Sequence, residues 1–160
     1  MKFKAHEIRF DPAVDAGTRW VDVMYRDHGL HCRLDPLASR GSRVTGWTLG
    51  PVGVTRADLA AMELWPVDSS DSWQGECIYF KLIVSGSVVV RQNDRAHCFN
   101  AGDMLALNPL HSFTESIPDR ASIIAVRIPK QLLKERGWKS SLEGLIVPEM
   151  APADAVAISH

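Results

Sequence analysis

The run Tyr79–Val84 contains a lysine among apolar and aromatic residues, and this lysine is the first side chain that could do chemistry. Side chains alternate between the two faces of a β-strand, so Lys81 shares a face with Tyr79 and Ile83. If that face lines the inside of a barrel, the ammonium needs a partner, because an unpaired buried charge is strongly unfavourable. An anionic ligand would supply it. A lysine on the outer face, or one paired with a protein carboxylate, is the more common situation, since lysine is rarely buried.

Arginines also interrupt strand-like segments. Arg127 lies within the apolar run Ile123–Ile128, and Arg56 and Arg91 lie in other predicted strands. A guanidinium can hold a carboxylate through two parallel hydrogen bonds, so each arginine could bind an acidic ligand. Each is more often a solvated strand residue or half of a surface ion pair.

Four large aromatic side chains fall on predicted strands: Trp47, Trp65, Tyr79 and Phe113. Together they could line a pocket for a flat apolar ligand. Any one of them alone is better explained as a core residue.

Histidine and cysteine offer weaker candidates. His28 and His31 lie at the end of a predicted helix beside Asp27, where metal binding is less favoured than a stabilising interaction with the helix dipole. No Ser-His-Asp, Cys-His or paired-carboxylate set has motif support. The three cysteines form no Cys-x-x-Cys pair, which favours a reduced, cytoplasmic protein.

Short strands and tight turns must position these residues. The predicted strands of the central region are residues 79–84, 87–91, 97–99 and 104–107, with turns at 85–86, 93–94 and 102–103. Short strands joined by two-residue turns form an antiparallel meander that closes into a small barrel or sandwich. A small barrel can hold one small ligand.

Further elements flank this region. Asp11-Pro12 and Gly29 predict an amphipathic helix over residues 12–28, since an acidic N-cap followed by proline starts helices and glycine ends them. Further strands are predicted at residues 44–49, 52–57, 61–65 and 121–128, with a loop at 66–75 and a turn at 116–119. A short helix over 130–136 stops at Gly137, and residues 153–160 resemble the start of another helix.

The composition excludes several classes. A chain of 160 residues with 46% hydrophobic content fits one domain with its own core. The net charge of −1, with scattered Lys and Arg, provides no basic patch for nucleic acid. The N-terminus lacks the apolar core of a signal peptide, and no apolar run reaches the about 20 residues of a membrane span.

Three segments, taken together, resemble a known family: IYFKLIVSGSVVVRQND, HCFNAGDMLALNPLHSFTES and IIAVRIPKQLLKERG. Their turn spacing resembles a cupin barrel, and more narrowly the N-terminal effector-binding domain of AraC/XylS-type transcriptional regulators. A closing strand that runs into proline and a Leu-Leu helix is typical of that family, as is a Trp20-bearing helix before the barrel. The resemblance covers about residues 10–140 and implies an all-β, cupin-like (double-stranded β-helix) barrel with an N-terminal helix and C-terminal helices.

Metal-dependent cupins hold their metal with three histidines and a glutamate. Counted from Gly86 and Gly102, those positions fall near Ser72, Gln74, Tyr79 and Phe113. None of these is a good ligand, and a shift of one or two residues brings in only Asp71 and Glu76. We therefore expect no metal, no cofactor and no enzymatic activity.

The resemblance implies that position 79 faces the lumen of the barrel. The candidate ligand-binding residues are then Trp47, Arg56, Trp65, Tyr79, Lys81, Phe113 and Arg127, and the effector is a small organic molecule, such as an aromatic or carboxylate compound. Leu132 and Leu133 are candidates for a dimer interface.

The resemblance also implies a domain organisation: an N-terminal helical arm (1–38), an effector-binding barrel (39–128) and C-terminal helices (129–160) before a DNA-binding helix-turn-helix domain that these residues do not include. We expect a homodimer that binds DNA only through that absent domain and does not contact a membrane. Two alternatives stay open: a metal-dependent cupin oxygenase or isomerase, and a ligand-free domain used only for dimerisation.

Overall fold

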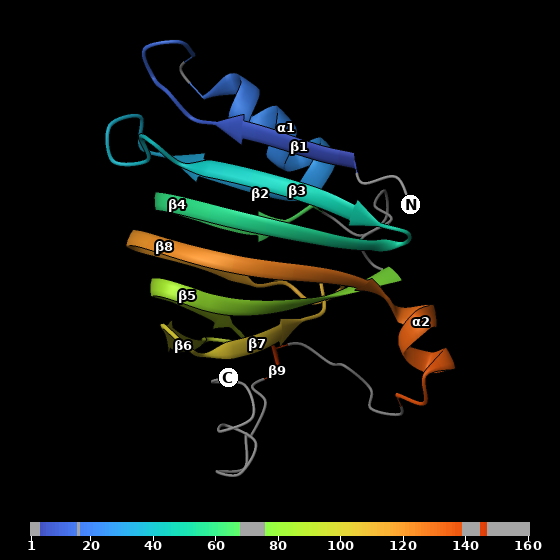
Figure 1. Cartoon of the computed structure of the whole chain (residues 1–160). Coiled ribbons are helices and arrows are strands. Elements are labelled where there is room, and N and C mark those ends of the chain that lie inside the picture. Colours follow the sequence, from blue (N-terminus) through green and yellow to red (C-terminus); the bar gives the residue numbers. More distant parts are fainter. Residues whose placement is uncertain (1–3, 16, 68–75, 139–144, 147–160) are drawn as a thin grey trace.

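A computed structural model of the chain describes residues 4–15, 17–67, 76–138 and 145–146. Strands dominate it, as the sequence predicts (Figure 1). The strands are β1 (Lys4–Arg9), β2 (Leu30–Leu34), β3 (Arg43–Leu49), β4 (Val52–Pro66), β5 (Cys77–Gln92), β6 (Arg95–Asn100), β7 (Met104–Leu107), β8 (Thr114–Pro129) and β9 (Leu145–Ile146). The helices are α1 (Thr18–His28) and α2 (Lys130–Glu135). Within the described ranges, neither helix has the length and apolar character needed to cross a membrane.

Three long strands, β4, β5 and β8, form the frame of the fold. Their halves nearer the β3–β4 hairpin make a first sheet, in which β1, β3, β4, β8, β5, β7 and β9 follow one another (Figure 1). Their other halves make a second sheet, in which β2 pairs with β4 and β6 pairs with β5. All of these pairings are antiparallel.

The two sheets face each other. Lys81 of β5 pairs with Ala125 of β8, and Glu115 lies ten residues earlier in β8. Ten extended residues span about 33 Å at about 3.3 Å per residue. Nevertheless, Lys81 Nζ lies 2.5 Å from Glu115 Oε2. The long strands must therefore bend back, so that the inner faces of the two sheets enclose a lumen.

Apolar side chains fill most of that lumen. The first sheet contributes Ile8, Val44, Ile83 and Ile123, and the second sheet contributes Met62, Leu64, Val88, Val90, Phe99, Phe113 and Ile117. Helix α1 adds Trp20, which is 1% exposed, and Met24. This shared apolar core holds the two sheets and α1 together.

The predicted turn at Ser85-Gly86 is wrong, because β5 continues through it. The pairing of β5 with β8 is irregular on both sides of Gly86, where the strand passes from the first sheet to the second. Gly86 has φ +74°, and a Cβ there would lie 1.9 Å from the carbonyl oxygen of Arg120. Glycine signals both turns and bulges, so the sequence alone did not separate the two.

Two other predicted breaks are also absent. Residues 52–57 and 61–65 belong to one strand, β4, with a register shift between Ala60 and Met62. The predicted turn at 116–119 lies inside β8, opposite that shift. The structure therefore has bends within long strands where the sequence predicted turns between short strands.

The N-terminal helix is shorter than predicted. Asp11 accepts a hydrogen bond from the Ala13 N–H and forms a local turn, while α1 begins at Thr18. Asp15 provides the start signal, because its carboxylate accepts hydrogen bonds from the N–H groups of Gly17, Thr18 and Arg19.

The first 38 residues also form more than a helical arm, because β1 pairs with β3 and β2 pairs with β4. Other expectations are confirmed. Gly29 ends α1 with φ +60°, and Asn93-Asp94 forms the tight turn between β5 and β6 with φ of 50° and 59°. The helix predicted at 153–160 lies outside the described residues.

Candidate functional site

The inner face of the first sheet changes from apolar to polar toward the β3–β4 hairpin. One row across the sheet, from β1 to β5, is Ile8, Val44, Ala57, Ile123 and Ile83. Two residues along each strand, the next row on the same face is His6, Gly46, Thr55, Ala125 and Lys81. The row after that includes Gly53, Arg127 and Tyr79. Small residues therefore form a floor, with basic side chains at its edges.

These side chains form a group that we call the lumen cluster: His6, His28, Tyr79, Lys81, Glu115 and Arg127. Burial increases along it from the surface to the core. His6 is exposed, while His28, Tyr79 and Arg127 are half-buried. Lys81 and Glu115 are buried. The cluster thus extends from an exposed end at His6 to a buried end at Lys81 and Glu115.

Lys81 and Glu115 join the two sheets. The ammonium on β5 and the carboxylate on β8 lie 2.5 Å apart, and their side chains are 9% and 1% exposed. The sequence left two partners open for a buried Lys81, an anionic ligand or a protein carboxylate. In the structure the partner is a protein carboxylate, that of Glu115. Such a pair fixes geometry more than it adds net stability, because both charges have lost their hydration.

Arg127 and Tyr79 lie side by side on β8 and β5. The guanidinium lies on Gly53, where a Cβ would be 3.1 Å from its central carbon. Burial raises the pKa of Tyr79 to about 12, although the charge of Arg127 and its hydrogen bond to the tyrosine oppose this shift. The phenol therefore stays protonated and can donate a hydrogen bond at neutral pH.

His6 and His28 connect β1 to the end of α1. Their Nε2 atoms lie 3.5 Å apart. The His6 ring lies directly on Gly46, where a Cβ would be 2.2 Å from the ring. Burial, together with the nearby His6, Arg127 and Lys81, lowers the pKa of His28 to about 4, while Asp27 opposes this shift. His28 is consequently a neutral imidazole at pH 7.

The lumen cluster brings several hydrogen-bond donors close together. It combines a guanidinium, a phenol and two imidazoles beside one buried ion pair, and these groups can hold a polar ligand. In the described ranges, no group of three or more His, Cys, Asp or Glu side chains is placed to hold a metal ion. Ser72, Gln74 and Asp71, which the cupin comparison indicated, lie outside those ranges.

The structure brings together three of the residues that the sequence singled out, Tyr79, Lys81 and Arg127. Phe113 lies elsewhere in the lumen, within the apolar core and 6% exposed. Trp65 follows the buried Leu64 in β4, so its side chain lies on the outer face of the second sheet. There it stacks on His31 with 5.6 Å between ring centroids. Leu132 and Leu133 are half-buried on α2, and their role at a dimer interface stays a prediction.

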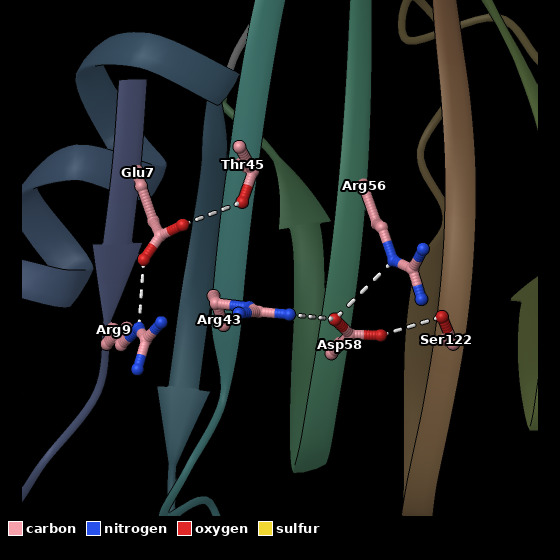
Figure 2. A network of polar contacts seen from close by, with 7 residues as sticks. All are labelled: Glu7, Arg9, Arg43, Thr45, Arg56, Asp58 and Ser122. Atoms are coloured by element: carbon pink, nitrogen blue, oxygen red, sulfur yellow. Dashed lines mark hydrogen bonds and ion pairs between the residues drawn. The ribbon is translucent and has the colours of Figure 1, made fainter. Parts of the chain in front are cut away.

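Trp47 and Arg56 are on the outer face of the first sheet, away from the lumen cluster. Figure 2 shows Arg56 within a network of polar contacts on this face. Its Nε lies 3.7 Å from an Asp58 oxygen that Arg43 approaches to 3.4 Å, and Ser122 donates a hydrogen bond to the other oxygen. Burial raises the pKa of Asp58, but these hydrogen bonds and the arginine charges outweigh it and lower that pKa on balance.

Sequence reasoning missed three members of the cluster. Glu115 could have been found, because it alternates with the buried Phe113 and Ile117 and therefore points inward with them. His28 was considered as a weak metal ligand with His31 and as a residue at the end of a helix, and not as part of the barrel. His6 carries no comparable signal, since its role depends on the pairing of β1 with β3.

Comparisons with known proteins agree with this architecture. The family model of the AraC-binding-like domain matches residues 18–157. The crystal structure of the AraC-like transcriptional activator CuxR superposes with a TM-score of 0.69 at 17% identity, over 83% of this chain and 50% of that chain. The chain therefore spans about half the length of that activator. No curated protein matches it in sequence.

Smaller proteins of known structure also match. The EutQ protein of Clostridium difficile has a TM-score of 0.44 at 15% identity, over 61% of this chain and 80% of that one. A Cupin 2 conserved barrel domain protein from Salinispora arenicola CNS-205 has a TM-score of 0.45 at 14% identity, over 64% of this chain and 91% of that one. With a family model that matches most of its length and a cupin-like barrel as its fold, this chain belongs to the AraC-binding-like domain family.

Proposed function

We propose that this chain is the effector-sensing domain of an AraC-type transcriptional regulator, and that a small organic effector binds at the lumen cluster. The observation that carries the proposal is the change from apolar to polar side chains on the inner face of the first sheet. Polar groups inside a fold are costly unless they are satisfied, so a half-buried group of donors beside a glycine floor is well suited to a ligand.

Regulation would follow from a population shift. An effector that binds one arrangement of the flanking elements more tightly favours that arrangement. Arg127 lies three residues before α2, and His28 is the last residue of α1, so the cluster touches both helical elements around the barrel. Through these helices, the effector would control dimerisation and the placement of a C-terminal DNA-binding domain.

The test is a thermal-shift screen of the purified chain with small organic compounds of varied charge. A ligand that binds only the folded state stabilises it by about 2.7 kcal/mol at 100 times its Kd. We expect hits whose effect is lost in Tyr79→Phe/Arg127→Gln but kept in Arg56→Gln, a matched arginine on the outer face of the same sheet. Stabilisation that survives the lumen changes would contradict the proposed site.

The alternatives make different predictions. A ligand-free dimerisation domain would associate in sedimentation experiments, while every compound in the screen left its melting temperature unchanged. A metal-dependent cupin enzyme would bind stoichiometric metal, and no observation in the described residues favours such a site.

A further inference from the structure

We propose that the effector is a small organic acid, that its carboxylate binds at the lumen cluster between Arg127, Tyr79 and the His6–His28 pair, and that its binding draws a proton onto that pair. This inference rests on the proposed sensing function and adds the ligand's chemical class and a proton linkage.

The geometry of the floor favours an anionic ligand. The guanidinium of Arg127 lies close to Gly53 and the ring of His6 lies close to Gly46, two positions where the backbone carries no side chain. Thr55 and Ala125 continue this floor between them in the sheet. A ligand above the floor meets N–H and O–H donors from β1, α1, β5 and β8, and such donors are matched best by an anionic oxygen group.

The balance of charge favours one carboxylate over a phosphate. Of the two permanent cations in the cluster, Lys81 is already bound to Glu115 in a buried pair. Arg127 presents its planar fork of N–H donors and can hold a carboxylate in bidentate fashion beside Tyr79. Because the charges of Lys81 and Glu115 cancel, the formal charge of the described cluster, counted without the histidines, matches a carboxylate monoanion better than a phosphate dianion.

The histidine pair gives the site its proton linkage. The charged and titratable groups that act on His28 come from every element around it: His6 on β1, Asp27 on α1, Lys81 on β5 and Arg127 on β8. Burial and the neighbouring His6, Lys81 and Arg127 keep His28 neutral at pH 7, against the opposing effect of Asp27. A bound carboxylate adds a negative charge within this group, which favours the imidazolium form, so binding should take up protons from solution.

Isothermal titration calorimetry tests this inference with matched probes: hexanoate against hexanamide, and phenylacetate against phenylacetamide and phenyl phosphate. At least one acid should bind, its amide should bind at least about tenfold more weakly, and Arg127→Gln should reduce acid binding by about tenfold or more. Arg127→Lys should also weaken binding, because it keeps the charge and loses the fork. Arg56→Gln should leave binding unchanged.

The proton linkage is measured by repeating the titration at pH 6 in buffers of different ionisation enthalpy. The apparent binding enthalpy should change with the buffer, showing net proton uptake, and His28→Gln should abolish that dependence in the weaker acid binding that remains. Melting curves and circular dichroism of each variant establish that it is folded before its binding is interpreted.

The outcomes separate this inference from the proposed function. Equal lumen-dependent binding of acid and amide would overturn the acid class while leaving a sensing domain. Tighter binding of phenyl phosphate than of phenylacetate would overturn the carboxylate assignment, and buffer-independent enthalpies would overturn the proton linkage. If compounds of every class in the wider screen failed to bind, the sensing function itself would fall.

Discussion

At the scale of single residues, Lys81 and Glu115 concentrate two opposite charges where the surrounding core is apolar. Loss of one partner leaves the other charge buried, so we expect Lys81→Met to lower the free energy of unfolding by about 3 to 5 kcal/mol. The double variant Lys81→Met/Glu115→Leu should recover most of this loss, because it removes both desolvated charges. Urea unfolding of the four proteins in the double-mutant cycle measures the coupling.

An exposed ion pair is the control for this cycle. Arg33 and Glu63 form an ion pair between β2 and β4 with side chains that are 71% and 34% exposed. Their cycle should give a coupling of about 1 kcal/mol or less. Equal couplings for the two pairs would contradict the assignment of Lys81 and Glu115 to a desolvated lumen.

His28 should make the stability of the fold depend on pH. Its pKa falls from 6.5 to about 4 in the folded protein, so between these values the unfolded chain binds more protons than the folded one. Stability is therefore lost as the pH falls through this window, by about 2 kcal/mol between pH 7 and pH 5 from this residue. His28→Gln should flatten the curve of unfolding free energy against pH by that amount.

His111→Gln is the matched control for this measurement, because His111 is an exposed histidine after β7. It should leave the slope between pH 7 and pH 5 unchanged. A slope that fell in both variants alike, or in neither, would remove His28 from the explanation of acid sensitivity.

At the scale of elements, Gly86 permits β5 to serve both sheets. We expect Gly86→Ala to destabilise the fold by well over 2 kcal/mol, because the new methyl group would collide with the backbone of Arg120 in addition to straining a positive φ. Gly102→Ala shares the positive φ, at +93°, but its methyl group would meet nothing within 4 Å.

The difference between the two glycine variants isolates the strand crossing. Gly102→Ala should cost only about 1 to 2 kcal/mol, the conformational part of the effect. Thermal and urea unfolding compare the two variants directly. Similar losses at both positions would mean that the contact between β5 and β8 at Gly86 can relax.

Local patterns predict local structure, and this explains which elements the sequence could predict. The alternation around Lys81 and the turn at Asn93-Asp94 depend on near neighbours, and both predictions agree with the structure. The predicted turn at Ser85-Gly86 was wrong because glycine occurs both in turns and at bends within a continuous strand. The predicted start of α1 was wrong because two acidic residues, Asp11 and Asp15, could each cap the helix. In the folded chain, Asp15 accepts the hydrogen bonds at the start of α1, and Asp11 forms a local turn.

At the scale of the whole molecule, the candidate site depends on contacts between residues far apart in sequence. Period two placed Lys81 on the same face as Tyr79, and the family resemblance implied that this face points inward, whereas Arg127 was singled out only because it interrupts an apolar strand. The partners Glu115, His6 and His28 come from the other sheet, an edge strand and a helix, and only the closing of the sandwich brings them near. Strand order and register determine these contacts between distant residues, and local sequence patterns do not encode either of them.

This arrangement predicts how a bound effector reaches the rest of a regulator. Arg127 precedes α2 by three residues, and α2 directly follows the end of β8, so a ligand that holds Arg127 should restrain the helix (Figure 1). With a carboxylate probe that binds in calorimetry, we expect slower amide hydrogen exchange in residues 127–135. Residues 95–100 of β6, at the far edge of the second sheet, should exchange at an unchanged rate. Arg127→Gln in the presence of the same probe should restore the rate in α2. Protection confined to β1 and α1 would instead mean that the effector acts through the His6–His28 contact, and that α2 takes no part in the response.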